Sequence, residues 1–114
     1  MELTREAFES LKQQQWFKGR IASDSMEPLI RVGEVIVVLV GEKQLKRFDI
    51  VVFWYEGKLM CHYLWQLNKR VTPLLMQTKS LQGRRDLPIP PEDYLGKVIS
   101  HRLKFWHKLK ALLR

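Results

Sequence analysis

The sequence predicts a mostly β domain with a short helix near its N-terminus and an amphipathic helix at its C-terminus. Several short segments rich in Val, Ile and aromatic residues are separated by turn residues, a pattern typical of antiparallel strands. Apolar residues at helical spacing occur near the two ends of the chain. The 114 residues are 46% hydrophobic and 28% charged, a size and balance that favour one globular domain.

The N-terminal elements are a helix, a strand and a loop. Residues 4–15 are expected to form a helix, with Thr4 as N-cap and Ala7, Phe8 and Leu11 on one face. A short strand is expected at residues 19–22. A loop restrained by Pro28 then covers residues 23–30.

The middle of the chain carries the strongest strand signals. Its apolar runs alternate with polar connections, and Glu56-Gly57 and Asn68-Lys69 are turn signals. We expect strands at residues 34–40, 48–55, 59–67 and 71–78.

The C-terminal part begins with a loop at residues 80–91, which contains Gly83 and three prolines. A last strand is expected at 94–100, followed by a basic amphipathic helix at 101–114. We therefore divide the chain into an N-terminal helical segment (1–20), a β domain (21–100) and the C-terminal helix (101–114).

Charge and targeting signals bear on partners and location. The net charge is +8, which favours anionic partners without choosing among them. The polar N-terminus has no apolar signal-peptide core, and no apolar run approaches the roughly 20 residues of a membrane-spanning helix. The single cysteine, Cys61, suits a reducing compartment. We expect a cytoplasmic protein, with peripheral contact to a membrane as an alternative.

The chemistry is expected in Ser23-Asp24-Ser25-Met26-Glu27-Pro28. A serine hydroxyl becomes a nucleophile when a base takes its proton and donors hold the oxyanion that forms. A tight loop can expose the hydroxyl and direct backbone N–H groups at one point. From the residues alone, a capping or solvated serine remains the alternative.

Three motifs in order resemble a known superfamily. Ser-x-Ser-Met-x-Pro is followed by Phe48-Asp49-Ile50-Val51-Val52-Phe53 and then by Leu95-Gly96-Lys97-Val98-Ile99. These are similar to the nucleophile box, the Gly-Asp-Ile-Val-x-Phe strand and the closing strand of signal-peptidase-like serine peptidases. That superfamily includes the type I signal peptidases and the self-cleaving domains of SOS repressors. The resemblance implies their β-ribbon fold and a peptidase activity.

The resemblance also assigns roles. Ser25 matches the nucleophile, Ser23 the residue that helps to bind the oxyanion, and Met26 lies beside them in the oxyanion and substrate-binding segment. His62 falls at the position of the general base, which indicates the histidine-base subclass; an unperturbed histidine has a pKa of ~6.5 and accepts a proton near neutrality.

The acid that supports this histidine matches less closely. The family segment Thr-Lys-Gly-Asp-Asn reads Thr78-Lys79-Ser80-Leu81-Gln82 here, and Asp86 follows near the position of the second acid. Asp86 is therefore the candidate for orienting His62. A loop aspartate that pairs with Arg84 or Arg85, or that caps the turn, is the alternative.

The sequence thus predicts a serine endopeptidase that cleaves a peptide or protein substrate by a Ser-His mechanism, with no cofactor and no metal site. One alternative is an inactive peptidase-like domain that binds peptides or acts as an adaptor at the membrane surface. Another is a regulator that cleaves itself or a partner. Residues 101–114 resemble an interfacial membrane helix, although the same pattern also fits a helix packed on the domain. Nucleic acid is not an expected partner, because no recognisable binding motif accompanies the basic residues.

Overall fold

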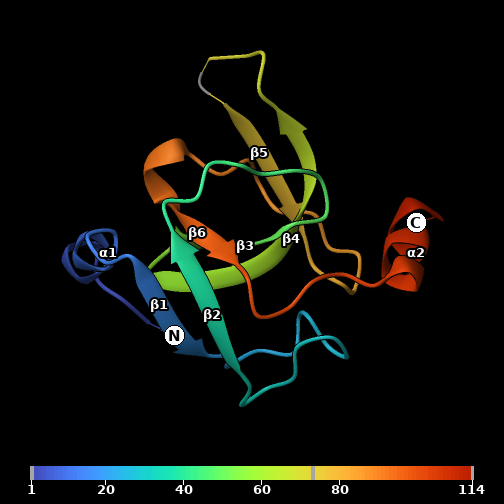
Figure 1. Cartoon of the computed structure of the whole chain (residues 1–114), viewed down its shortest axis with the longest axis horizontal. Helices are drawn as coiled ribbons and strands as arrows, with labels where there is room; N and C mark the ends of the chain where they lie inside the picture. Colours follow the sequence, from blue (N-terminus) through green and yellow to red (C-terminus); the bar gives the residue numbers. More distant parts are fainter. Residues whose placement is uncertain (1, 73, 114) are drawn as a thin grey trace.

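The computed structural model describes residues 2–72 and 74–113 and confirms the mostly β fold. Over these residues the chain forms one six-stranded antiparallel sheet, with a helix at each end and one short 3-10 helix (Figure 1). The helices are α1 (Arg5–Leu11), η1 (Pro91–Asp93) and α2 (Phe105–Leu113). The strands are β1 (Trp16–Arg20), β2 (Val35–Val40), β3 (Ile50–Tyr55), β4 (Lys58–Asn68), β5 (Leu75–Lys79) and β6 (Tyr94–Val98).

The strand order is β1-β2-β6-β3-β4-β5, so the last strand of the chain lies in the middle of the sheet. β4 is long and changes partner along its length. Residues 58–63 pair with β3, whereas residues 63–68 pair with β5 on the other edge. The edge of β4 that faces away from β3 is therefore not covered by β5 over residues 59–62. This edge and the edge strand β1 border the candidate site.

The sheet is buried on both faces at its centre. In β3, Ile50 and Val52 belong to one apolar cluster, which also contains Phe8 and Met26. Val51 and Phe53 point to the opposite face and belong to a second apolar cluster. This alternation follows from the period of two residues in a strand, and it explains why β3 is a continuous apolar run.

Local chemistry fixes the turns and caps that the sequence indicated. The Thr4 side chain accepts a hydrogen bond from the Ala7 N–H and caps α1. Glu56 and Gly57 form the two-residue turn between β3 and β4, and both have positive φ angles (49° and 80°). Such angles are those of a hairpin turn whose twist matches that of the flanking strands.

Several predicted boundaries were wrong. The predicted helix 4–15 ends at Leu11, and the first strand starts at Trp16 rather than at residue 19, because Trp16 already pairs with Leu39 of β2. The fourth central strand starts at Leu75 rather than at residue 71, because the chain turns back over residues 69–72.

The C-terminal boundaries also differ. β6 ends at Val98, and α2 starts at Phe105 rather than at residue 101. The connection stays extended because the Ile99 N–H donates to the Val37 carbonyl and the Val37 N–H donates to the Ser100 hydroxyl. Parts of the predicted elements that fall on residues 1, 73 and 114 lie outside the described residues.

Within the described part of the chain, no helix is both long enough and apolar enough to cross a membrane.

Candidate active site

The loop between β1 and β2 carries Ser25 and is closed at its base by backbone hydrogen bonds. The Ile21 N–H donates to the Glu34 carbonyl, and the Gly33 N–H donates to the Ile21 carbonyl. Inside the loop, Met26 and Ile30 are almost fully buried in the apolar core. These two side chains hold the turn that presents the Ser25 hydroxyl.

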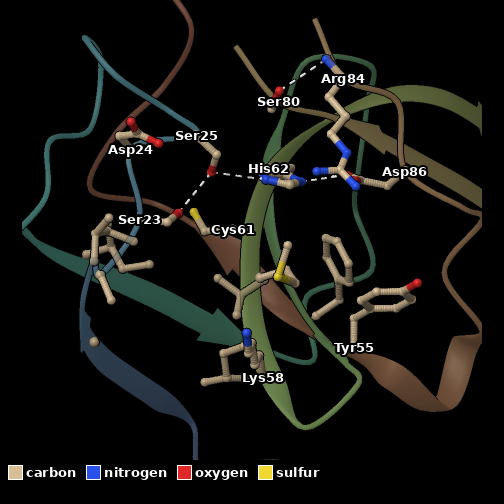
Figure 2. Close-up of a pocket in the computed structure, with 18 of the residues that line it drawn as sticks. Ser23, Asp24, Ser25, Tyr55, Lys58, Cys61, His62, Ser80, Arg84 and Asp86 are labelled. Atoms are coloured by element: carbon tan, nitrogen blue, oxygen red, sulfur yellow. Dashed lines mark hydrogen bonds and ion pairs between the residues drawn. The ribbon is translucent and has the colours of Figure 1, made fainter. Parts of the chain in front are cut away.

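Ser25, His62 and Asp86 form a continuous chain of hydrogen bonds, although they come from three separate segments (Figure 2). Nε2 of His62 lies 3.1 Å from Oγ of Ser25. Nδ1 of the same ring lies 2.5 Å from Oδ2 of Asp86. A ring that carries its proton on Nδ1 donates to the carboxylate and turns the lone pair of Nε2 toward the hydroxyl.

His62 is rigidly placed for this contact. It lies on β4 opposite Val51 of β3 and is only 3% exposed. The Phe53 ring lies edge-on to the imidazole, with the ring centres 6.1 Å apart. Burial and the contact with Phe53 restrict rotation of the ring, so the two nitrogens keep their separate partners.

Asp86 is held by the end of β5. Its Oδ2 also accepts a hydrogen bond of 2.7 Å from the Thr78 hydroxyl. Its backbone N–H donates to the Thr78 carbonyl, and its carbonyl accepts from the Gln77 side chain. The carboxylate is therefore fixed by side-chain and backbone contacts to one strand end. Within residues 2–72 and 74–113 its ion-pair partner is His62, and it forms no ion pair with Arg84 or Arg85.

The turn at residues 80–84 links Asp86 to the loop of residues 21–34, which we call the nucleophile loop after the candidate nucleophile Ser25. The Leu81 N–H donates to the Ser25 carbonyl at 3.0 Å, and the Gln82 side chain donates to the Asp24 carbonyl at 3.0 Å. Two loops that are far apart in the sequence are thus joined directly beside the serine. These two bonds hold the turn at residues 80–84 against the segment that carries Ser25.

The remaining predicted site residues lie in different surroundings. Oγ of Ser23 is 3.1 Å from Oγ of Ser25, so the two hydroxyls lie side by side. The Met26 side chain is 1% exposed and packs in the core. Met26 is therefore part of the core and does not line the cleft beside Ser25.

A cleft of about 700 Å³ lies beside Ser25. One wall contains Phe17, Gly19 and Ile21, from β1 and the residue that follows it. The opposite wall is β4 from Lys58 to His62, whose outer edge is not covered by β5 over residues 59–62. Figure 2 shows Lys58 and Tyr55 at the end remote from Ser25, where Glu2 forms a β-bridge with Lys58. A cleft bordered by two strand edges suits an extended peptide.

Cys61 lines the same cleft but is not a competing nucleophile. Burial raises the pKa of its thiol to about 12, which keeps it protonated at neutral pH. Its neighbour His62 points to the other face of β4. In residues 2–72 and 74–113 we find no cluster of three or more His, Cys, Asp or Glu side chains suited to a metal ion.

Comparison with known protein families identifies the class of the domain. The model of the Peptidase S24-like family matches residues 2–86, a span that includes Ser25, His62 and Asp86. The chain therefore belongs to the Peptidase S24-like family. No curated protein matches the chain.

Some residues of the site were not assigned a role from the sequence. Thr78 was recognised as part of a family segment, but its hydrogen bond to Asp86 was not predicted. Gln77 and Gln82 carried no signal, because their bonds go to backbone carbonyls brought near by the fold. For Leu81 the contact is made by the backbone N–H, which every residue except proline possesses.

Proposed function

We propose that the protein is a serine endopeptidase that cleaves a peptide or protein chain by a Ser-His mechanism. The observation that supports this most strongly is the hydrogen-bonded chain Ser25–His62–Asp86 at the wall of a cleft. Membership of a peptidase-like family supports the same reaction class. No metal or cofactor is required in the steps that follow.

The substrate would bind in extended form in the cleft, as an added strand between β1 and the free edge of β4. Backbone hydrogen bonds would supply affinity, and side-chain pockets would supply specificity. Oγ of Ser25 then attacks the scissile carbonyl carbon while Nε2 of His62 takes the hydroxyl proton. The negative charge that develops on the carbonyl oxygen is held by the Ser23 hydroxyl and the Ser25 N–H.

Collapse of this intermediate breaks the C–N bond, and His62 returns the proton to the leaving amine. Water then hydrolyses the acyl-enzyme by the same proton transfers in reverse roles. Asp86 orients the imidazole and stabilises its positive charge at both stages.

Acylation of Ser25 tests this proposal directly. A serine-reactive acylating probe would be added to the wild type, Ser25→Ala and His62→Ala between about pH 5 and pH 9. We expect labelling of the wild type alone, because Ser25→Ala removes the hydroxyl that is acylated and His62→Ala removes the base that takes its proton. Intact-protein mass spectrometry reads the added mass, and circular dichroism verifies that both variants are folded.

Labelling that persists in folded His62→Ala at the wild-type rate would refute the Ser-His mechanism. A folded wild type that is not labelled at any pH would instead favour the alternative of a peptide-binding domain without catalysis. In that case peptide affinity should be unchanged in Ser25→Ala.

A further inference from the structure

The C-terminal helix α2 turns its apolar side away from the domain. Successive helical residues are rotated by about 100°, so the large apolar residues of α2 share one side. They are Phe105, Trp106, Leu109, Leu112 and Leu113, and they are 77, 60, 46, 52 and 79% exposed. On the opposite side, Ala111 is only 4% exposed. The helix therefore contacts the domain through a small residue and leaves its large apolar side chains in solvent, the reverse of an ordinary surface helix.

The exposed apolar side is bordered by positive charge. Lys108 and Lys110 lie on its two flanks, and residues 101–114 contain no acidic residue. The pKa of His107 is lowered by partial burial and by the charges of Lys104 and Lys110.

The positive border continues beyond the helix. Nζ of Lys108 lies 5.8 Å from the centre of the Phe48 ring, and the exposed guanidinium of Arg47 covers the same ring at 5.1 Å. An apolar face that includes Trp and Phe and is edged by lysines and arginines matches the chemistry of an anionic lipid surface.

The inner side of α2 rests against the loops of the candidate site. His107, Lys110 and Ala111 line a small pocket together with Glu27 and Pro28 of the nucleophile loop. Leu81 and Gln82, whose bonds reach Ser25 and Asp24, line the same pocket. Figure 1 shows α2 at the end of the molecule remote from α1.

We propose that α2 is an interfacial anchor that docks the protein on an anionic membrane through Phe105, Trp106, Leu109, Leu112 and Leu113. Lys108, Lys110 and Arg47 contact the lipid headgroups. Docking places the nucleophile loop within about one helix diameter (~10 Å) of the headgroup layer. A substrate cleaved in this arrangement would be a peptide or protein held at the membrane surface. The anchor itself does not depend on catalysis.

Vesicle binding of the full chain tests the anchor without any assay of activity. The probes are vesicles of phosphatidylcholine alone and vesicles that also contain roughly 30 mol% phosphatidylglycerol. We expect binding to the anionic vesicles at least about tenfold stronger than to the neutral ones, because each basic residue near the surface adds attraction. Co-sedimentation gives the bound fraction, and added salt should reduce it.

Leu109→Glu and Val71→Glu form a matched pair of variants. The two side chains are 46% and 44% exposed, and each change replaces an exposed apolar residue by the same acid. We expect Leu109→Glu to weaken binding to anionic vesicles by about tenfold or more, whereas Val71→Glu, in the β4–β5 turn, stays within about twofold of the wild type. Circular dichroism and Ser25 acylation verify that both variants keep the fold and the site.

Three results would overturn the proposal. They are no binding of the wild type to anionic vesicles, equal binding of Leu109→Glu and the wild type, and a dimer of the wild type that Leu109→Glu dissociates. The last would mean that the apolar face covers a second copy of this chain. None of them would bear on the Ser-His mechanism, which acylation tests separately.

Discussion

The substitution Asp86→Asn separates the charge of the candidate acid from its geometry. Both side-chain bonds of Asp86 fall on one oxygen, since Oδ2 contacts Nδ1 of His62 at 2.5 Å and the Thr78 hydroxyl at 2.7 Å. An asparagine has a single oxygen. Because the Thr78 hydroxyl donates its hydrogen bond, it favours the amide oxygen at the position of Oδ2. His62 then keeps its proton on Nδ1 and its lone pair toward Ser25.

The expected fall in the acylation rate of Asp86→Asn follows from the loss of the negative charge alone. A hydrogen bond to a charged group contributes about 1.5–3 kcal/mol, and a neutral one contributes about 0.5–1.5 kcal/mol. The difference of about 1–1.5 kcal/mol corresponds to a roughly tenfold slower acylation. An amide in the reverse orientation would instead donate to Nδ1 and impose the wrong tautomer, for which the loss in a Ser-His-Asp site is about 10⁴-fold.

Thr78→Val tests which orientation holds. The Thr78 side chain is fully buried, and valine has nearly the same shape without the hydroxyl. In the Asp86→Asn background, Thr78→Val removes the hydroxyl that orients the amide. The acylation rate of the double variant should therefore fall by a larger factor than the product of the factors for the two single variants. The measurement is the rate of Ser25 acylation by an activated ester, with folded variants verified by circular dichroism.

Acylation of folded Asp86→Asn at the wild-type rate would show that Asp86 does not stabilise the imidazolium. A loss near 10⁴-fold in the single variant would retain a role for Asp86 but refute the orientation by Thr78.

Three further predictions concern single residues. Ser23→Ala should slow acylation by about 10²-fold, the loss expected for one oxyanion donor, and unchanged rates would remove Ser23 from that role. Gly96→Ala should lower the free energy of unfolding by about 2–3 kcal/mol in a urea titration, because a Cβ there would lie 2.3 Å from the Leu39 carbonyl oxygen. Gly19→Ala is the milder control, since its added Cβ meets only a movable Phe17 ring, and equal losses would contradict the argument. The Cys61 thiol, whose pKa of about 12 keeps it protonated, should resist iodoacetamide near neutral pH until urea unfolds the chain. Rapid alkylation of the folded protein would show that the thiol is accessible and ionised.

The central strands were predictable from the sequence because their burial leaves a local pattern. β3 is apolar at every position from Ile50 to Phe53, as expected for a strand covered on both faces. The pairing of the strands was not predictable in this way. β6 inserts between β2 and β3, and this order depends on contacts between residues far apart in the chain, of which the local pattern carries no record.

The boundaries were wrong where two local signals competed. Residues 12–15 are good helix formers, yet α1 ends at Leu11 and the Val40 N–H already donates to the Gln15 carbonyl. Pairing with β2 therefore overrides helix propensity, which is a weak local preference. The same competition moved the start of α2 to Phe105, since sheet contacts hold residues 99 and 100 extended.

In the candidate site, too, some residues were predictable from the sequence and others were not. Ser25 and His62 were predicted from motifs whose residue types are set by the chemistry they would perform. The hydrogen bonds from Leu81 and Gln82 to the nucleophile loop were not predicted, because a backbone N–H and a surface amide leave no distinctive pattern in the sequence. Their positions depend on how the turn at residues 80–84 folds.

That turn also explains how Asp86 reaches His62 although the Gly-Asp pair of the family segment is absent. Ser80 closes the turn with two bonds to Arg84, since its N–H donates to the Arg84 carbonyl and its hydroxyl accepts from the Arg84 N–H. Gly83 has a φ angle of 92°, which few other residues adopt without strain. The chain consequently returns along β5, with Arg85 bridged to Lys79.

The next residue along this return is Asp86, whose N–H donates to the Thr78 carbonyl and whose carboxylate comes to lie beside His62. The position of a carboxylate beside an imidazole is therefore set by where the backbone turns. A turn of different sequence can therefore place a carboxylate from a later residue in the same contact with the imidazole. The departure from the family motif at Ser80-Leu81 is thus compatible with the proposed Ser-His mechanism. The acylation rate of Asp86→Asn measures whether the Asp86 carboxylate acts on His62.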